Sequence, residues 1–340
     1  MRPFDFTAAA TVEDALQEAG VTPEFHFIAG GTNLLDLMKE DVMRPIKLID
    51  ISRLPLDRIE ATPGGGLLLG ALARNADTAH HPLVQQRYPL VAQALLAGAS
   101  PQLRNMATNG GNLLQRTRCY YFYDVGVPCN KREPGSGCPA RGGLNRIHAV
   151  LGASEHCIAT HPSDLCVALA ALDASVHVRS TQGERTIAFA DFHRLPGDRP
   201  ELDHTLAPGE LITGIELPAQ GFAAHSAYLK LRDRQSYAFA LVSVAAALEV
   251  DEDGRLRDIR VALGGVAHKP WRNRAAEQHC IGQPASTGVF TALAEALMAE
   301  AIGQGQNDFK IPLARRAIVR ALEQAAGIAS AISTAPESRP

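Results

Sequence analysis

Two short glycine-rich segments constrain the fold of this chain more than any other feature of its sequence. The first, "AGGTNLL", spans residues 29–35, and the second, "ATNGGNLLQ", spans residues 107–115. The first follows a strand-like run at 25–28 and precedes a helical period, after which "KLIDIS" at 47–52 reads as another strand. The chain therefore begins with a predicted strand–helix–strand unit whose glycine turn lies at the start of the helix.

Both glycine segments have the composition of a phosphate-binding turn. Glycine lets backbone N–H groups approach a phosphate closely, and Thr32, Asn33, Thr108 and Asn112 can add side-chain donors. Neither segment is a G-x-G-x-x-G fingerprint, and neither carries a P-loop lysine. Two such loops in one domain can surround a pyrophosphate from both sides. The alternative is a pair of tight Asn-Gly turns that hold no ligand.

Overall composition limits the classes of function. The chain has 340 residues, 46% of them hydrophobic, which is enough for two or three domains with separate cores. A net charge of −3 gives no reason to expect nucleic acid or an anionic membrane as a partner. No run of about 18 apolar residues predicts a membrane span. The N-terminal segment "MRPFDFTAAATVEDAL" has neither the apolar core of a signal peptide nor twin arginines, so the chain alone is expected to stay in the cytoplasm.

A domain boundary is expected near residues 218–224, where a strand flanked by prolines ends. Beyond it, residues 226–250 predict strands, "DEDG" predicts a turn, and 255–267 predict the returning strand of a hairpin. The remaining sequence predicts helices at 271–280, 289–303 and 312–327.

The segment 117–143 is rich in cysteine. The six cysteines of the chain are Cys119, Cys129, Cys138, Cys157, Cys166 and Cys280. The first five are spaced C-x9-C-x8-C-x18-C-x8-C without a C-x2-C pair, which disfavours a zinc ribbon. A large chain without a secretion signal disfavours a disulfide framework. A long irregular loop needs a reason to be ordered, and an iron–sulfur cluster on widely spaced cysteines would be one. Thiols that bind nothing are the alternative.

Four blocks along the chain resemble the FAD-binding subunit of molybdenum hydroxylases, the family of xanthine dehydrogenase, carbon monoxide dehydrogenase and aldehyde oxidoreductase. They are "FIAGGTNLLDLMK", "RNMATNGGNLLQ", "HPSDL" and "YLKLRDRQSYAFALVSVAAALEV", in the family's order, and the resemblance covers residues 1–325. It implies an α+β fold, with a two-part vanillyl-alcohol-oxidase (PCMH-type) FAD-binding domain followed by a smaller α+β domain of the CO dehydrogenase flavoprotein C-terminal type. The implied boundaries are 1–218 for the first domain (parts 1–57 and 58–218, with a cysteine-rich insertion at 116–158), 222–328 for the second, and a flexible tail at 329–340.

The resemblance also implies how FAD would be bound. Backbone amides would wrap the pyrophosphate from one side, and a second set of residues would hold the phosphates from the other side. Ser163 and Asp164 would lie near the adenosine end, and Lys230 would reach the flavin or its ribityl chain. For Asp164 the alternative is a helix N-cap, and for Lys230 a solvated strand lysine. No catalytic residue is expected, because the flavin does the chemistry. The first set is Ala29, Gly30, Gly31, Thr32, Asn33 and Leu34, and the second is Thr108, Gly111 and Asn112.

The cysteine-rich insertion looks most like that of periplasmic aromatic-aldehyde oxidoreductases, which hold an additional [4Fe-4S] cluster. This likeness implies four ligands, which are Cys119, Cys129, Cys138 and Cys157. Cys166 lies in a predicted apolar helix and is expected to be a packed thiol, and Cys280 is expected to be structural.

The resemblance implies the FAD and [4Fe-4S] subunit of a heterotrimeric molybdenum-dependent aldehyde oxidoreductase. Its expected partners are a molybdenum-cofactor large subunit and a [2Fe-2S] small subunit, and it would pass electrons from the [2Fe-2S] clusters through FAD to an external acceptor. The alternative is the flavin subunit of a related enzyme for a purine, CO or an aromatic acyl-CoA. A scaffold with decayed FAD loops is disfavoured by the intact glycines 30, 31, 110 and 111. Co-export with a partner would place the complex in the periplasm, and the cytoplasm is the alternative.

Overall fold

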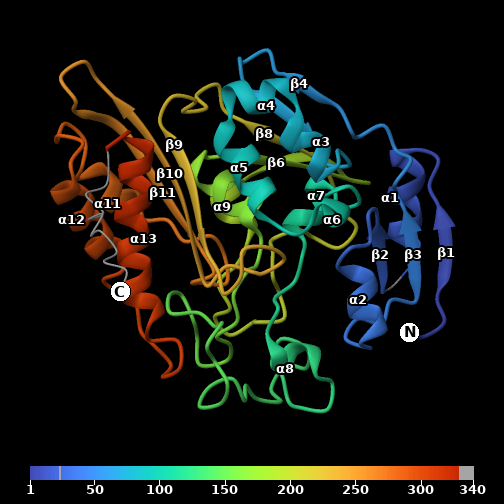
Figure 1. Cartoon of the computed structure of the whole chain (residues 1–340). Helices are drawn as coiled ribbons and strands as arrows, with labels where there is room; N and C mark the ends of the chain where they lie inside the picture. Colours follow the sequence, from blue (N-terminus) through green and yellow to red (C-terminus); the bar gives the residue numbers. More distant parts are fainter. Residues whose placement is uncertain (23, 329–340) are drawn as a thin grey trace, which may run out of the picture.

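The N-terminal part of the chain forms a small parallel sheet. The computed structural model describes residues 1–22 and 24–328, so the predicted tail at 329–340 lies outside the described residues. The sheet has the strand order β1-β3-β2, and it contains the predicted strand–helix–strand unit (Figure 1). Its elements are β1 (Asp5–Ala8), α1 (Val12–Val21), β2 (Phe25–Ile28), α2 (Leu34–Lys39) and β3 (Lys47–Asp50).

The second part is built on a five-stranded antiparallel sheet with the order β4-β5-β8-β6-β7. Its strands are β4 (Ile59–Ala61), β5 (Leu67–Gly70), β6 (Ser175–Ser180), β7 (Gly183–Ala188) and β8 (Leu211–Leu217). Its helices are α3 (Asn75–His80), α4 (Pro82–Arg87), α5 (Pro89–Ala97), α6 (Pro101–Arg104), α7 (Asn109–Leu113), α8 (Tyr120–Tyr123), α9 (Asp164–Ala171) and α10 (Phe189–Phe192).

The C-terminal domain is a three-stranded antiparallel sheet, β11-β10-β9, covered by helices. The helices α12 and α13 lie on its outer face, and α5 and α9 of the first domain lie on its inner face (Figure 1). Because both faces are covered, β10 is apolar along most of its length instead of alternating. The elements are β9 (Ser226–Leu231), β10 (Val242–Val250), β11 (Leu256–Gly264), α11 (Arg274–Gln278), α12 (Thr287–Leu297) and α13 (Lys310–Ala325).

Helix α9 packs against elements of both domains. It contacts α5, α7 and α10 of the first domain and both β10 and β11 of the C-terminal domain. All of its residues except Ala170 are buried, as expected of a helix that is apolar all round. The start of α9 is therefore held by both domains, which matters for the site described below.

Residues 147–163 lie against the C-terminal domain without regular structure. Their sequence suggests both strand and turn chemistry, and the described chain has turns and bends but no strand there. Their backbone instead hydrogen-bonds to the C-terminal domain, with Val150 and Leu151 donating to the Val266 carbonyl and His161 to the Ala267 carbonyl. The strands predicted within 226–250 are present as β9 and β10, and a ten-residue loop separates them. The polar run "RDRQS" begins that loop.

The cysteine-rich segment projects from the lower edge of the molecule in Figure 1, between α7 and α9, and α8 is its only helix among the described residues. No helix in the described part of the chain has the length and apolar character needed to cross a membrane.

Candidate functional site

A cleft of about 1010 Å³ lies between the two parts of the first domain and the β9–β10 loop. Its size is at the upper end of the roughly 300–1,000 Å³ that is usual for small-molecule sites, as a dinucleotide requires. Both glycine segments, the start of α9 and the β9–β10 loop contribute to its walls. Every residue predicted to bind the cofactor lines this cleft except Lys230.

The first glycine loop presents free backbone donors to the cleft. Within residues 1–22 and 24–328, the N–H groups of Gly30, Gly31, Thr32 and Asn33 donate to no protein acceptor. Gly31 has φ of 68°, which turns the chain so that successive N–H groups lie along one concave surface. Asn33 is fixed through its side-chain oxygen, which accepts from the Arg116 N–H at 2.8 Å. Four adjacent unpaired amides are the donor set that a pyrophosphate needs.

The two glycine segments touch each other through their backbones. A Cβ added at Gly30 would lie 1.9 Å from the carbonyl oxygen of Met106, immediately before the second segment. Only glycine allows this approach. The pairing brings the two loops to the same wall of the cleft, an arrangement that either loop sequence alone does not reveal.

The second glycine segment forms the start of helix α7, where the sequence predicted a glycine turn. Thr108 is the N-cap of α7, and its hydroxyl accepts from the Gly111 N–H at 3.2 Å. The fully buried Asn109 joins this helix to α3 and β5, since its side chain bonds Asn75, Thr78 and the Gly70 carbonyl. The side chain of Thr108 is thus used to build the loop.

A side-chain network links the second loop to the start of α9. The Ser163 hydroxyl donates to Asn112 Oδ1 at 2.5 Å, and Asn112 Nδ2 donates to Asn75 Oδ1 at 2.7 Å. Ser163 also accepts from the Cys166 N–H, so Ser163, and not Asp164, is the N-cap of α9. Ser163 and Asn112 therefore hold the two walls of the cleft in register.

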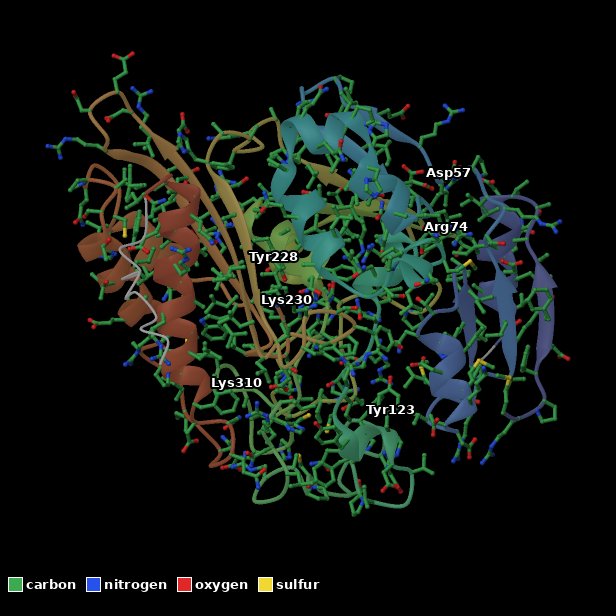
Figure 2. The ribbon with its side chains drawn as sticks, in the orientation of Figure 1. Asp57, Arg74, Tyr123, Tyr228, Lys230 and Lys310 are labelled. Atoms are coloured by element: carbon green, nitrogen blue, oxygen red, sulfur yellow. The ribbon has the colours of Figure 1, made fainter. Side chains whose placement is uncertain are left out.

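Lys230 is neither a cleft residue nor a solvated lysine. Its Nζ lies 2.8 Å from Asp164 Oδ2 and 3.1 Å from the Ala97 carbonyl oxygen, and its side chain is only 4% exposed. The other Asp164 oxygen accepts from the Tyr228 hydroxyl at 2.7 Å. Burial, followed by the Asp164 charge, raises the pKa of Tyr228 well above its ordinary value, so this hydroxyl stays a donor. Figure 2 shows Tyr228 and Lys230 side by side on β9. Lys230 therefore positions the Asp164 carboxylate, which lines the cleft, from its buried side.

Replacing Lys230 by methionine is expected to lower the free energy of unfolding by about 3–5 kcal/mol, because the Asp164 carboxylate is then left buried without its cation. Denaturant unfolding of the purified protein measures this loss. Adding Asp164→Asn to Lys230→Met should restore part of it. The matched control is Lys47→Met on β3, which breaks a partly exposed pair with Glu18 of α1 and should cost less than about 1 kcal/mol. Equal losses in the two lysine variants would contradict the expectation.

Several cleft residues could not be found from sequence patterns. Tyr237 and Phe239 from the β9–β10 loop line the cleft and are 59% and 48% exposed. The guanidinium of Arg118 lies 4.9 Å from the centre of the Phe239 ring and also bonds Asp36 at 3.2 Å. In the sequence, the only signal for these residues was a pair of aromatic residues next to a polar run. Flat side chains at this wall suit a planar ring system.

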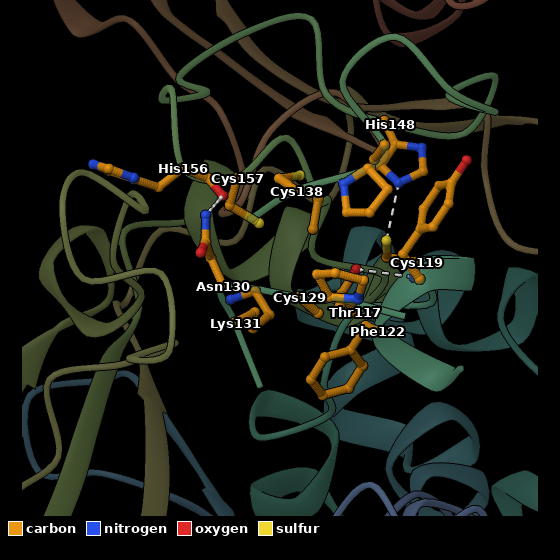
Figure 3. Close-up of a pocket in the computed structure, with 15 residues that line it drawn as sticks. Thr117, Cys119, Phe122, Cys129, Asn130, Lys131, Cys138, His148, His156 and Cys157 are labelled. Carbon is orange, nitrogen blue, oxygen red and sulfur yellow. Dashed lines mark hydrogen bonds between the residues drawn. The ribbon is translucent and has the colours of Figure 1, made fainter. Parts of the chain in front are cut away.

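The four cysteines predicted as cluster ligands line one cavity, shown in Figure 3. Cys119, Cys129 and Cys157 are 7%, 7% and 5% exposed, Cys138 is partly exposed, and none forms a disulfide. Burial raises the pKa of Cys119 to about 12 and that of Cys157 to about 11. Such thiols become thiolates only beside a positive metal centre. Four unpaired thiols at one cavity form a donor set suited to a metal cluster.

Side-chain bonds to the backbone hold the cysteine loop, since regular structure is almost absent from it. Asn130 spans its two halves, because its oxygen accepts from the Gly137 N–H at 2.7 Å and its nitrogen donates to the His156 carbonyl at 3.0 Å. Arg132 donates to the carbonyls of Tyr121 and Phe122, both at 2.8 Å. These bonds connect parts of the loop that are up to 26 positions apart in the sequence.

Two histidines contact the thiols from the interior. His148 Nε2 lies 3.1 Å from Cys119 Sγ, and His268 Nε2 lies 3.3 Å from Cys157 Sγ. Burial lowers the pKa of His148 to about 4 and that of His268 well below its ordinary value, so both imidazoles are neutral near pH 7. No sequence pattern pointed to either residue.

The cleft and the cysteine cavity share one wall. Along the extended segment before α8, Arg116 and Arg118 line the cleft, whereas Thr117 and Cys119 line the cavity. This alternation is the period of two expected of extended chain. Lys131 crosses between the two sites, because it lines the cavity and its Nζ lies 2.5 Å from Asp203 Oδ1 at the cleft.

Cys166 is completely buried in α9 and is not part of the cysteine cavity. Its sulfur lies within 4.8 Å of one ring nitrogen each of His161 and His193. In the described part of the chain no other group of three potential ligand atoms from His, Cys, Asp or Glu is this close. In the described residues, no three of the four sulfurs of the cysteine cavity therefore all lie within 4.8 Å of one another.

Comparison with known proteins gives consistent results. A family model described as the FAD binding domain in molybdopterin dehydrogenase matches residues 2–220, and one described as the CO dehydrogenase flavoprotein C-terminal domain matches 226–325. These matches and the observed sheets confirm the predicted α+β fold class.

Two curated relatives and one solved structure illustrate the similarity. The aldehyde oxidoreductase FAD-binding subunit PaoB of Escherichia coli strain K12 is 51% identical over 326 residues, covering 96% of this chain and 99% of that protein. The glyceraldehyde dehydrogenase medium chain of Sulfolobus acidocaldarius is 26% identical, with 82% of each chain covered. A chain of the carbon monoxide dehydrogenase structure from Hydrogenophaga pseudoflava superimposes with a TM-score of 0.75 and 26% identity, covering 97% of this chain and 100% of that one.

Proposed function

Because this chain belongs to the FAD-binding subunits of the xanthine dehydrogenase and CO dehydrogenase family, we propose that it is the FAD- and [4Fe-4S]-containing subunit of a molybdenum-dependent aldehyde oxidoreductase. It is an oxidoreductase subunit with an FAD-binding domain, as its family requires. The single observation that carries the finer proposal is the convergence of four unpaired cysteines on one cavity beside the cleft.

The cleft residues fit FAD through their donors. The unpaired amides of residues 30–33 would hold the pyrophosphate, and Thr108, Gly111 and Asn112 would keep the second glycine loop in place beside them. Asp164, oriented by Lys230 and Tyr228, would accept hydrogen bonds from the sugar or ribityl hydroxyls. Bound flavin would supply the redox chemistry, and this chain would supply binding and orientation.

The spacing of the thiols favours a cluster over a single zinc ion. A zinc ion with Zn–S bonds of about 2.3 Å holds its sulfurs about 3.8 Å apart. In the described residues no three of these cysteine sulfurs lie within 4.8 Å of one another. In a cubane each thiolate binds a different iron, so the four sulfurs are farther apart than around one zinc ion. Cys119, Cys129, Cys138 and Cys157 would therefore be its ligands.

The wider assembly follows from the relatives. The chain matches PaoB along nearly its whole length, which supports an aldehyde as the substrate of the complex and a carboxylic acid as its product. We propose a heterotrimer with a molybdenum-cofactor large subunit and a [2Fe-2S] small subunit, in which electrons reach the FAD and then an external acceptor. A folded complex exported with a partner's signal would act in the periplasm. The cytoplasm is the alternative location.

The test is the composition and activity of the purified complex. We expect about one FAD and about four irons for each copy of this chain, and oxidation of aldehydes in preference to purines, CO or aromatic acyl-CoA. A preparation without iron that cannot be reconstituted would refute the cluster. Zinc in place of iron would do the same, and preference for a non-aldehyde substrate would favour the related hydroxylases instead.

A further inference from the structure

Two of the four cavity thiols each face a buried imidazole from the protein interior. The Nε2 atoms of His148 and His268 lie 3.1 Å and 3.3 Å from the sulfurs of Cys119 and Cys157. The two histidines are 1% and 8% exposed. Such a distance to sulfur is that of a hydrogen bond, so each contact has a donor and an acceptor side.

The surroundings of the other ring nitrogen decide which tautomer the cavity favours. Nδ1 of His148 and Nδ1 of His268 are both buried and have no hydrogen-bond partner within the described residues. A neutral imidazole has one N–H. If the proton were on Nδ1, it would have no acceptor, and Nε2 would direct its lone pair at a thiolate. If the proton is on Nε2, the ring donates a hydrogen bond to the sulfur. A thiolate ligand therefore selects the Nε2–H tautomer at both positions.

The C-terminal domain carries one of the two histidines and holds the backbone of the other. His268 belongs to that domain, just beyond β11, and the neighbouring Ala267 carbonyl accepts from the His161 N–H at 3.0 Å. The carbonyl of His148 accepts from Lys310 Nζ at 2.9 Å and from Asn307 Nδ2 at 3.2 Å. Lys310 is completely buried on α13 and also donates to the Gly265 carbonyl at 2.8 Å (its position is shown in Figure 2). The C-terminal domain, which contributes none of the four proposed cysteine ligands, thus helps to position both histidines.

We propose that His148 and His268 are positioning residues that donate Nε2–H hydrogen bonds to the thiolates of Cys119 and Cys157 and so raise the reduction potential of the cluster. The inference rests on the proposed [4Fe-4S] site. Reduction adds negative charge that spreads onto the sulfurs, and a donor aimed at a sulfur stabilises the reduced form more than the oxidised form. The C-terminal domain thereby sets the potential of a cluster that is bound by the other domain.

The experiment is a redox titration of the cluster in the whole complex, followed by electron paramagnetic resonance. His148→Leu and His268→Leu are each expected to make reduction less favourable by about tenfold, the effect of one hydrogen bond to a charged group, or about 59 mV for one electron. The Gln variants, whose amide can still donate, should remain closer to wild type. His156→Leu is the matched control, since this cavity histidine is exposed and its side chain bonds no sulfur in the described structure.

A second measurement keeps the inference testable if a variant fails to assemble. Wild-type complex with ¹⁵N-labelled histidine is expected to show a weak imidazole nitrogen coupling at the reduced cluster, as a hydrogen-bonded donor produces. Absence of any coupling, a strong coupling typical of a directly bound nitrogen, or unchanged potentials in iron-replete Leu variants would overturn the inference. A wild-type complex without iron would refute the proposed function itself, so the two failures are distinguishable.

Discussion

Serine in place of Cys157 is expected to remove most of the iron from this subunit while FAD stays bound. A serine hydroxyl does not ionise near neutral pH, and three thiolates hold a cubane poorly. Cys157 is 5% exposed, and its sulfur lies 3.3 Å from Nε2 of His268 in the C-terminal domain. Iron and flavin counts on the purified complex give the result directly.

The cysteine loop should also lose stability in this variant. Where metal binding orders a loop, loss of the metal removes that contribution to folding. Limited proteolysis is therefore expected to cleave within residues 117–143 faster than in the wild type. Cys280→Ser is the matched control, because Cys280 is equally buried, lies in the other domain and donates to the Ala276 carbonyl as serine also can. A Cys157→Ser complex with its full iron content would exclude Cys157 as a ligand.

Alanine at Gly30 is expected to abolish stable FAD binding. The added methyl group would lie 1.9 Å from the Met106 carbonyl oxygen and 2.7 Å from its carbon, so the two glycine loops would have to separate. Ordinary overpacking costs about 1–3 kcal/mol, and here both partners are backbone, which cannot rotate away as a side chain can. The separated loops no longer present the amides of residues 30–33 to one ligand.

The FAD content and melting temperature of the purified variant measure this effect. Gly20→Ala is the control in the same subdomain, since nothing lies within 4 Å of its added Cβ and alanine favours α1 by about 0.5–1 kcal/mol. We expect the control to keep its flavin and melt at or above the wild-type temperature. Wild-type flavin content in Gly30→Ala would show that the loops do not bind the cofactor together.

Local patterns predicted the elements that depend on neighbouring residues. Helical and strand periods located β2, α2 and β3, and the "DEDG" turn located the β10–β11 hairpin. Glycine and asparagine spacing identified both loops that line the cleft. These predictions succeeded because propensity, turn chemistry and periodicity act over a few residues of chain.

Irregular segments were less predictable. The sequence of 147–153 suggested strand and turn chemistry, but no strand forms there in the described chain, and the Val150 and Leu151 N–H groups donate to the Val266 carbonyl of the other domain. Lys230 was expected at the flavin and instead pairs with Asp164, 66 positions away in sequence. Neither contact could be predicted from neighbouring residues, because the packing of α9 against the C-terminal sheet determines which distant residue becomes the hydrogen-bond partner.

The sequence by itself determined the family, the α+β fold class, the two glycine loops and the four cysteines of the cavity. Only the tertiary structure decided that the loops meet at Gly30 and Met106, that Lys230 supports Asp164, and that His268 reaches Cys157 across 111 positions of sequence. The physical reason is the distance along the sequence that separates the interacting residues. Residue type and spacing specify what a segment can bind, whereas the packing of α9 between the first-domain helices and the C-terminal sheet specifies which distant side chains surround it.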